Sequence, residues 1–316
     1  MRRRLRRRPG GVLEALAPGS GKALRLVADL PRAARAPAAL FRRQRPEMDA
    51  ARRLNQGAAI LAFSVLADSA IEHYRGSFQN RAMYAPLVAS ALSLAASLVA
   101  AREPRPQPKL WRDAIFGSAT AIGLAGFGFH VYNILKRPGG PSWLNFFYAA
   151  PIGAPGALAM AGLLGAAAQR TDKRLLKDWT KGSPLSPGRL VALISAGGIA
   201  GAVGEAGLLH FRGAFQNPAM ILPLTAPPVA SALLGASALN RRGPRRLARW
   251  WLKLTALFGL IGAGFHAYGV SRNMGGWRNW SQNVLNGPPL PAPPSFAGAA
   301  LAGLAALSLI DQEADA

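Results

Sequence analysis

The segment HYRGSFQNRAMYAPL, residues 73–87, returns later in the chain as HFRGAFQNPAMILPL, residues 210–224. The two segments are identical at ten of fifteen positions without a gap. Similarity at this level inside one chain indicates a duplicated structural unit, and a duplication decides how the rest of the sequence is divided.

The register of this repeat, an offset of 137 residues, continues on both sides of the matched segments. Upstream, Asp68 aligns with Glu205. Downstream, FHVY at 129–132 aligns with FHAY at 265–268 after a shift of one residue. We therefore predict two repeated units, residues 55–170 and residues 189–312.

Composition places these units in a membrane. Half of the 316 residues are hydrophobic and only 16% are charged, whereas soluble domains carry about 25% charged residues. The apolar residues form long windows nearly free of Lys and Arg, which is typical of membrane spans of about 20 residues. We predict an all-α polytopic integral membrane protein with eight transmembrane helices in two tandem, parallel-repeat four-helix units. The predicted spans are 55–73, 82–101, 111–135, 146–168, 190–210, 219–239, 250–270 and 292–310.

The distribution of positive charge orients the predicted helices. Of the 38 Lys and Arg residues, thirty-one lie in segments on the side of the N-terminus and seven on the opposite side. Because cytoplasmic loops are enriched in Lys and Arg, both termini are predicted to be cytoplasmic. The opposite face is then the outer face, periplasmic for a bacterial inner (plasma) membrane. An even number of spans in each unit makes the two copies run in the same direction.

Two basic segments lie outside the predicted spans. Residues 1–54 hold fifteen Lys and Arg residues and are predicted to be a cytoplasmic extension, either disordered or an interfacial amphipathic helix. Its arginines are expected to contact anionic lipid headgroups. Membrane anchorage argues against a nucleic-acid partner. Residues 171–188 are predicted to be a basic cytoplasmic linker between the units. The absence of cysteine excludes a disulfide scaffold and thiolate-ligated metal clusters.

All four histidines of the chain occupy positions that match between the two units. They are His73, His130, His210 and His266. The predicted topology places all four near the outer face. With a rise of about 1.5 Å per residue, Asp68 and Glu205 lie roughly 7–8 Å deeper than His73 and His210.

A carboxylate inside a membrane span is costly unless it is paired, protonated or next to a polar cavity, so Asp68 and Glu205 are candidates for proton or ion coupling. The alternative is a structural pair that only holds helices together. Asp68 and His73 lie roughly 140° apart on a regular helix. Either the helix unwinds near Ile71, or Asp68 faces its own bundle while His73 closes the mouth.

The arginines Arg75 and Arg212 follow the repeated histidines and each precedes a glycine. We predict that these two side chains hold an anion, a carboxylate or a haem propionate in a tight outer loop. The Gln-Asn pairs that follow, residues 79–80 and 216–217, supply neutral polar groups there, or cap the next spans.

Several chemistries fit this set of residues. A b-type haem needs two imidazoles from facing helices. A quinol pocket needs an imidazole and a carboxylate that accept protons as electrons leave. Its aromatic walls in the first unit are predicted to be Phe127, Phe129, Tyr132, Phe146, Phe147 and Tyr148.

Two further interpretations use the same residues. No metal ligands are assigned, because a signature such as His-x-x-x-His is missing, although two histidines and one carboxylate per unit are a usable ligand set. Proline-interrupted spans and intramembrane carboxylates are also features of transporters.

The favoured hypothesis is a membrane subunit of an electron-transfer complex that binds quinol, with b-type haem as a further candidate cofactor, at an outer-face site. Two four-helix bundles in one chain resemble, as architecture alone, the quinol-interacting anchors of modular redox complexes. Other membrane or peripheral redox subunits are the expected partners, and enzymatic activity is left open. The predicted cofactor-binding residues are His73, His130, His210, His266, Arg75 and Arg212, with Asp68 and Glu205 for proton or ion coupling. The alternatives are a proton- or ion-coupled transporter and a structural or assembly membrane protein.

Overall fold

The structure is a computed structural model, and it describes residues 46–103, 106–240 and 242–314. Every regular element in these residues is a helix. The elements in chain order are α3 (Pro46–Arg75), η2 (Arg81–Tyr84), α4 (Ala85–Ala101), α5 (Leu110–Leu135), α6 (Trp143–Phe147), α7 (Gly153–Ala168), α8 (Lys173–Trp179), α9 (Pro187–Arg212), η3 (Pro218–Leu224), α10 (Ala226–Leu239), α11 (Arg245–Arg272), η4 (Gly276–Asn279), α12 (Trp280–Asn286) and α13 (Pro294–Ala314).

Seven helical segments of the described residues are long and apolar enough to cross a membrane: α3, η2 with α4, α5, α9, η3 with α10, α11 and α13. This indicates an integral membrane protein and confirms the prediction of an all-helical membrane fold. The remaining predicted span, 146–168, contains α7, which has 16 residues and begins only at Gly153. Pro151 precedes it, and proline, which lacks a backbone N–H, disfavours a helix continuing through that point.

The predicted N-terminal extension lies largely outside the described residues, which begin at Pro46, the first residue of α3. Its expected contact with anionic headgroups therefore lies outside them too. The predicted linker 171–188 contains the short helix α8.

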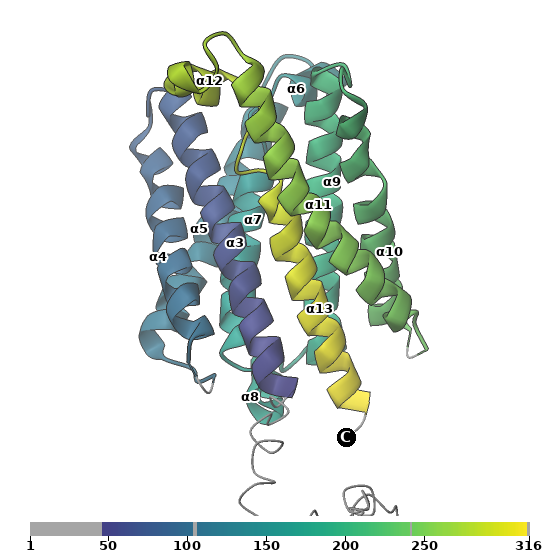
Figure 1. Cartoon of the computed structure of the whole chain (residues 1–316). Coiled ribbons are helices and arrows are strands. Elements are labelled where there is room, and N and C mark those ends of the chain that lie inside the picture. The colour runs from purple at the N-terminus through teal and green to yellow at the C-terminus, as the bar shows by residue number, and fades with distance from the viewer. Residues whose placement is uncertain (1–45, 104–105, 241, 315–316) are drawn as a thin grey trace, which may run out of the picture. The chain divides into compact units, whose positions relative to one another are not determined.

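Four helices, α3, α7, α9 and α13, pack against one another in a ring in which each contacts two of the others. The other long helices lie outside this ring (Figure 1). On one side, α4 packs on α3 and α5 packs on α7. On the other, α10 packs on α9 and α11 packs on α13. The two sets of four helices therefore have the same packing pattern.

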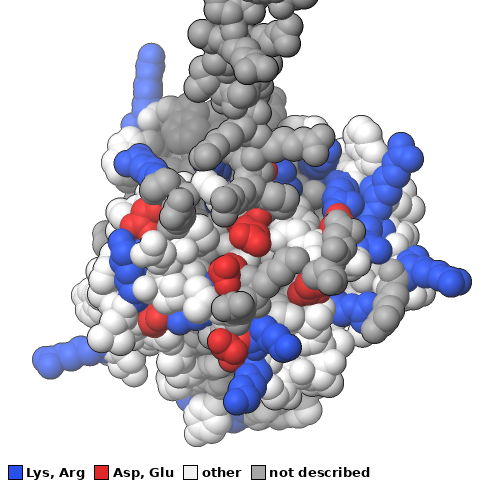
Figure 2. Space-filling view, turned by 90° about the horizontal axis from the view of Figure 1, so that it is seen from below, with Lys and Arg blue, Asp and Glu red and all other residues white. Residues whose placement is uncertain are grey.

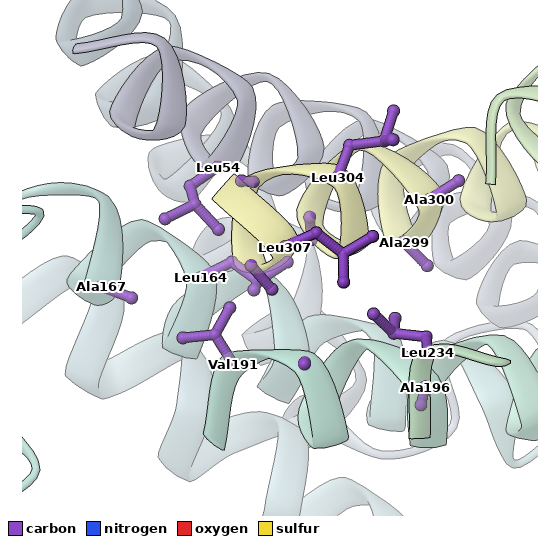
Figure 3. Packing of buried hydrophobic residues seen from close by; sticks show 14 of the residues in the cluster. Leu54, Leu164, Ala167, Val191, Ala196, Leu234, Ala299, Ala300, Leu304 and Leu307 are labelled. Atoms are coloured by element: carbon purple, nitrogen blue, oxygen red, sulfur yellow. The ribbon is translucent and has the colours of Figure 1, made fainter. Parts of the chain in front are cut away.

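The ring is held together by small residues and short aliphatic side chains. Leu54, Leu164, Val191 and Leu307, one from each of the four helices, meet in a common buried cluster (Figure 3). Within lipid, helices associate through close van der Waals packing, which small interfacial residues permit.

Two glycine contacts show how closely the helices approach. A Cβ atom on Gly57 of α3 would lie 2.7 Å from the Gly298 carbonyl oxygen of α13. A Cβ atom on Gly123 of α5 would overlap the Ala159 backbone nitrogen of α7 and lie 2.7 Å from the Pro155 carbonyl oxygen. Only glycine permits these backbones to lie so close.

Both α7 and α13 begin part way along the helices that flank them. Gly298 near the start of α13 packs against Leu61 of α3, and α3 then continues to Arg75, roughly 20 Å further. Figure 1 shows α13 beginning about midway along α3, below α12. The end of the bundle that carries α6 and α12 is hereafter called the α12 end, and the opposite one the α8 end.

The α8 end carries most of the described charges. Figure 2 looks at this end and shows Lys and Arg side chains around its edge, with carboxylates between them. Arg112 is only 1% exposed and donates two hydrogen bonds to Glu103. These bonds, together with Lys109, lower the pKa of the Glu103 carboxyl from 4.5 to about 2. Asp311 at the end of α13 pairs with Arg245 and Arg249 of α11.

The close contact at Gly123 predicts a strong effect of one added methyl group. Gly123→Ala should lower the unfolding free energy by about 1–3 kcal/mol, because the new Cβ overlaps backbone that cannot move aside. Thermal melting of the detergent-purified protein measures this. The control is Gly128→Ala in the same helix, where a Cβ has no neighbour within 4 Å. Equal melting temperatures of the two variants would contradict the packing described here.

Candidate functional site

The repeated segments fold into the same local structure at the α12 end. After α3 and α9, the chain turns through two non-glycine residues with positive φ, Ser77 and Phe78 in one case and Ala214 and Phe215 in the other. This left-handed conformation costs of order 1 kcal/mol or more per residue unless the surroundings stabilise it. It is the same in both copies.

Asparagine side chains end each of these turns. Asn80 accepts a hydrogen bond from the Ala82 backbone N–H at 2.9 Å, and Asn217 accepts one from Ala219 at 2.9 Å. The capping role expected for these residues is therefore observed.

Inside each turn, the histidine binds the loop that follows it. Nδ1 of His73 lies 2.7 Å from the Met83 carbonyl oxygen, and Nδ1 of His210 lies 2.7 Å from that of Met220. A carbonyl oxygen only accepts, so Nδ1 carries the proton in both rings. In the neutral ring, Nε2 is then left as a hydrogen-bond acceptor.

The other histidine of each half approaches the irregular segment before α7 or α13. Nδ1 of His266 on α11 donates to the Pro289 carbonyl oxygen at 2.7 Å. Nδ1 of His130 on α5 is buried close to the Pro151 carbonyl but has no hydrogen-bond partner within range. Within the second half, the His210 and His266 rings lie edge to face with centroids 6.4 Å apart.

The histidines thus form two pairs, one in each half. His130 interacts electrostatically with His73, and His266 interacts with His210. The described residues contain no group of three or more His, Asp or Glu side chains arranged to hold a metal ion.

The two carboxylates lie deeper, and they interact across the two halves. Asp68 and Glu205 are close enough for electrostatic interaction, although their helices, α3 and α9, lie diagonally across the ring. The Glu205 carboxylate packs directly against Gly153, at the start of α7. The positive end of a helix dipole favours negative charge at such a position.

The helix that carries Asp68 is continuous. α3 runs without interruption to Arg75, so the alternative in which it unwinds near Ile71 is wrong. His73, in the last turn of α3, is instead hydrogen-bonded to the Met83 carbonyl of η2.

The two arginines have different partners. Arg75 pairs with Glu72 one turn earlier on α3 at 2.8 Å. Arg212 reaches from α9 into the other half, where it donates to the carbonyl oxygens of Phe146 and Ala149 at 3.0 and 3.2 Å. Both therefore have protein partners, and their predicted binding of an anion stays a prediction.

An aromatic cluster forms where α6 meets the end of α9. The ring centroids of Trp143 and Phe147 lie 6.0 and 5.9 Å from that of Phe211. The aromatic residues 146–148 were expected to line a pocket of the first unit. Phe147 packs instead on Phe211 and Arg212 of the second unit, because the loop before α7 folds across toward α9.

Sequence reasoning missed the backbone groups that complete this site. The carbonyl oxygens of Met83, Met220 and Pro289 are supplied by irregular backbone, whose position no side-chain pattern encodes. The available signal was the cluster of Pro and Gly residues in PIGAPG, residues 151–156. Comparison of the chain with known protein families, with curated proteins and with solved structures finds no match.

The hydrogen bonds of Arg212 predict a specific loosening of the loop before α7. In Arg212→Gln, amide hydrogens of residues 143–153 should exchange roughly tenfold or more faster, because two charge-assisted bonds to backbone carbonyls are lost. Hydrogen–deuterium exchange followed by mass spectrometry reads this segment directly. Arg75→Gln is the matched control, since Arg75 bonds only within its own helix turn. Unchanged exchange in Arg212→Gln would show that these hydrogen bonds do not hold the loop before α7.

Proposed function

We propose that the chain crosses the membrane eight times, as two parallel four-helix units, with both termini in the cytoplasm of a bacterial inner membrane. The sequence repeat, the matching turns after α3 and α9, and the equal packing of the two sets of helices support this arrangement. The excess of Lys and Arg at the α8 end supports the orientation. The α12 end, with its histidines, then faces outward.

We further propose that the protein is a membrane subunit of an electron-transfer complex that binds quinol at its outer side. The observation that carries this proposal is the fixed orientation of His73, His210 and His266. A backbone carbonyl holds Nδ1 of each ring, so Nε2 is available to accept the proton of a quinol hydroxyl.

The carboxylates complete the chemistry. Oxidation of a quinol to a quinone releases two electrons and two protons. The electrons pass to a partner redox subunit, and imidazole Nε2 atoms accept the protons. Asp68 and Glu205, one helix turn or more below the histidines, exchange protons with these rings. A b-type haem between two imidazoles is the variant of this proposal in which the electron acceptor is bound by the same chain.

Histidine variants test the quinol site. Replacing all four histidines by alanine should weaken binding of a short-chain quinol analogue at least tenfold, since the hydrogen-bond acceptors are lost. Titration of the detergent-purified full chain, read by Trp fluorescence, measures the affinity. Ser271→Ala, at the same end of α11, is the control. Unchanged affinity in the histidine variant would refute a quinol site built on these rings.

A reduced-minus-oxidised visible spectrum of the same sample tests the haem variant of the proposal. Haem bands that disappear in the histidine variant would establish the histidines as its ligands. A spectrum without haem bands would contradict the haem variant, and the quinol titration would then test the quinol site by itself.

A second candidate function is proton- or ion-coupled transport, and one observation favours it. Asp68 lies near enough to Glu205 to act on it electrostatically, and Glu205 contacts Gly153 at the start of α7. Helices that begin inside the membrane and point their positive ends at charged groups are a recurrent feature of transporter sites.

Paired carboxamide variants test transport. If these carboxylates carry protons, the double variant Asp68→Asn with Glu205→Gln should lose proton flux into liposomes that contain the full chain and a pH-sensitive dye. Glu72→Gln is the matched control, because Glu72 lies near the end of the same helix and pairs with Arg75. Flux retained in the double variant removes these carboxylates from the pathway. If histidine and carboxylate variants alter only thermal stability, the polar residues have a structural role.

A further inference from the structure

A groove on the outer surface of α11 lies near the α8 end and is separate from the histidine and carboxylate site. It is a shallow, open depression lined by Trp250, Trp251, Lys253, Leu254 and Leu257. The Trp250 side chain is 66% exposed and Leu257 is 50% exposed. Such large apolar side chains facing outward on a membrane-spanning helix lie against lipid.

The mouth of this groove is basic. Lys253 places its ammonium group 5.3 Å from the centre of the Trp250 ring, and Arg246 is exposed one helix turn before Trp250. By contrast, Arg245 and Arg249 point toward α13 and pair with Asp311. Arg245 and Arg249 therefore bind α13 within the protein, whereas Arg246 and Lys253 lie on the outer surface beside the groove.

The length of the groove fits a lipid. From Arg246 to Leu257, α11 rises about 16 Å, from the charged end of the helix into its apolar part. Arg246 lies at the charged end, the Lys253 ammonium lies beside the Trp250 ring, and Leu254 and Leu257 follow further along the helix. This order matches a phosphate headgroup followed by an acyl chain. A water-soluble protein has no access to the deeper part, because it lies within the hydrocarbon.

The other half of the chain lacks these residues. Aligned through His130 and His266, positions 246, 250, 253 and 257 correspond to Leu110, Ala114, Gly117 and Ala121 on α5. The four-helix packing is the same in both halves, so packing does not require the aromatic and basic groups on α11. On α5, Trp111 is exposed at this end, but the cation beside its ring, Arg112, is buried and bonded to Glu103, whereas Lys253 and Arg246 lie on the outer surface of α11. Outward cations beside an exposed Trp point to an anionic ligand on α11.

We propose that this groove binds one anionic phospholipid of the cytoplasmic leaflet, with its phosphate at Arg246 and Lys253 and an acyl chain along Trp250 and Leu257. This inference rests on the proposed membrane orientation, in which the α8 end is cytoplasmic, and does not depend on quinol binding. It differs from the expected headgroup contacts of the N-terminal extension, because the groove lies entirely on α11.

The test compares lipid affinities of the full chain by native mass spectrometry in detergent, with phosphatidylglycerol and phosphatidylcholine as probes. The wild-type protein should retain phosphatidylglycerol in preference. Arg246→Gln with Lys253→Gln should weaken this binding roughly 30-fold, as expected for two removed charges near an anionic headgroup. Lys136→Gln is the control, since Lys136 lies 5.3 Å from the Tyr132 ring at the opposite end of α5. Equal affinity for both lipids, or a preference that persists in the double variant and therefore belongs to another segment, would overturn the proposal.

A second measurement does not require the charge variants to fold. Brominated phosphatidylglycerol should quench Trp fluorescence more strongly than brominated phosphatidylcholine, and Trp250→Phe should remove most of the difference. Equal quenching by the two lipids in the wild-type protein would exclude an anionic-lipid site at Trp250.

Discussion

A polypeptide that leaves a helix inside hydrocarbon exposes N–H and C=O groups that have no water to bond, and each unpaired group costs several kcal/mol. In this chain, α7 and α13 both begin beside helices that continue further toward the α12 end, and each follows an irregular segment. The surrounding helices supply partners: Arg212 binds the carbonyls of Phe146 and Ala149, and His266 binds the Pro289 carbonyl, while the Glu205 carboxylate packs against Gly153. The positions of Arg212 and His266 are explained first by this requirement.

The same requirement concentrates chemistry at one level of the bundle. Because α7 begins beside Glu205, a helix N-terminus, a carboxylate and a neighbouring carboxylate from the other half lie together. The rings that orient the loops also leave their second nitrogen available. Side chains that stabilise irregular backbone are thereby held in single orientations, which is the preorganisation that proton transfer to a ligand needs. Structural and functional interpretations of these residues are therefore not exclusive.

Sequence patterns predicted the membrane class and the position of seven long helices, since apolar windows and their length follow directly from bilayer thickness. The repeat correctly indicated that His73 and His210 have equivalent surroundings. Contacts between the halves were not predictable in this way. The packing of Phe147 on Phe211 depends on where the loop before α7 crosses toward α9, and that path is set by helix packing at Gly123 and similar positions rather than by any local periodicity. The backbone carbonyls that bind the histidines were not predictable either, because their positions also depend on the path of irregular segments.

The two halves share their helix packing and the turns after α3 and α9, but several aligned positions differ between them. Arg75 is held by Glu72, whereas the second half has Leu209 at the aligned position, and there Arg212 extends across to bind the loop of the first half. Aromatic residues 146–148 align with Asn283, Val284 and Leu285, so the second copy has no aromatic side chain at these positions. Glu205 of α9 packs against the N-terminus of α7, which belongs to the first half. Asp68 lies on α3, which carries a second acid, Glu72, near its end. The histidines and the carboxylate of one half therefore have different neighbours from those of the other half. A ligand or proton that enters through the first half meets a different environment from one that enters through the second.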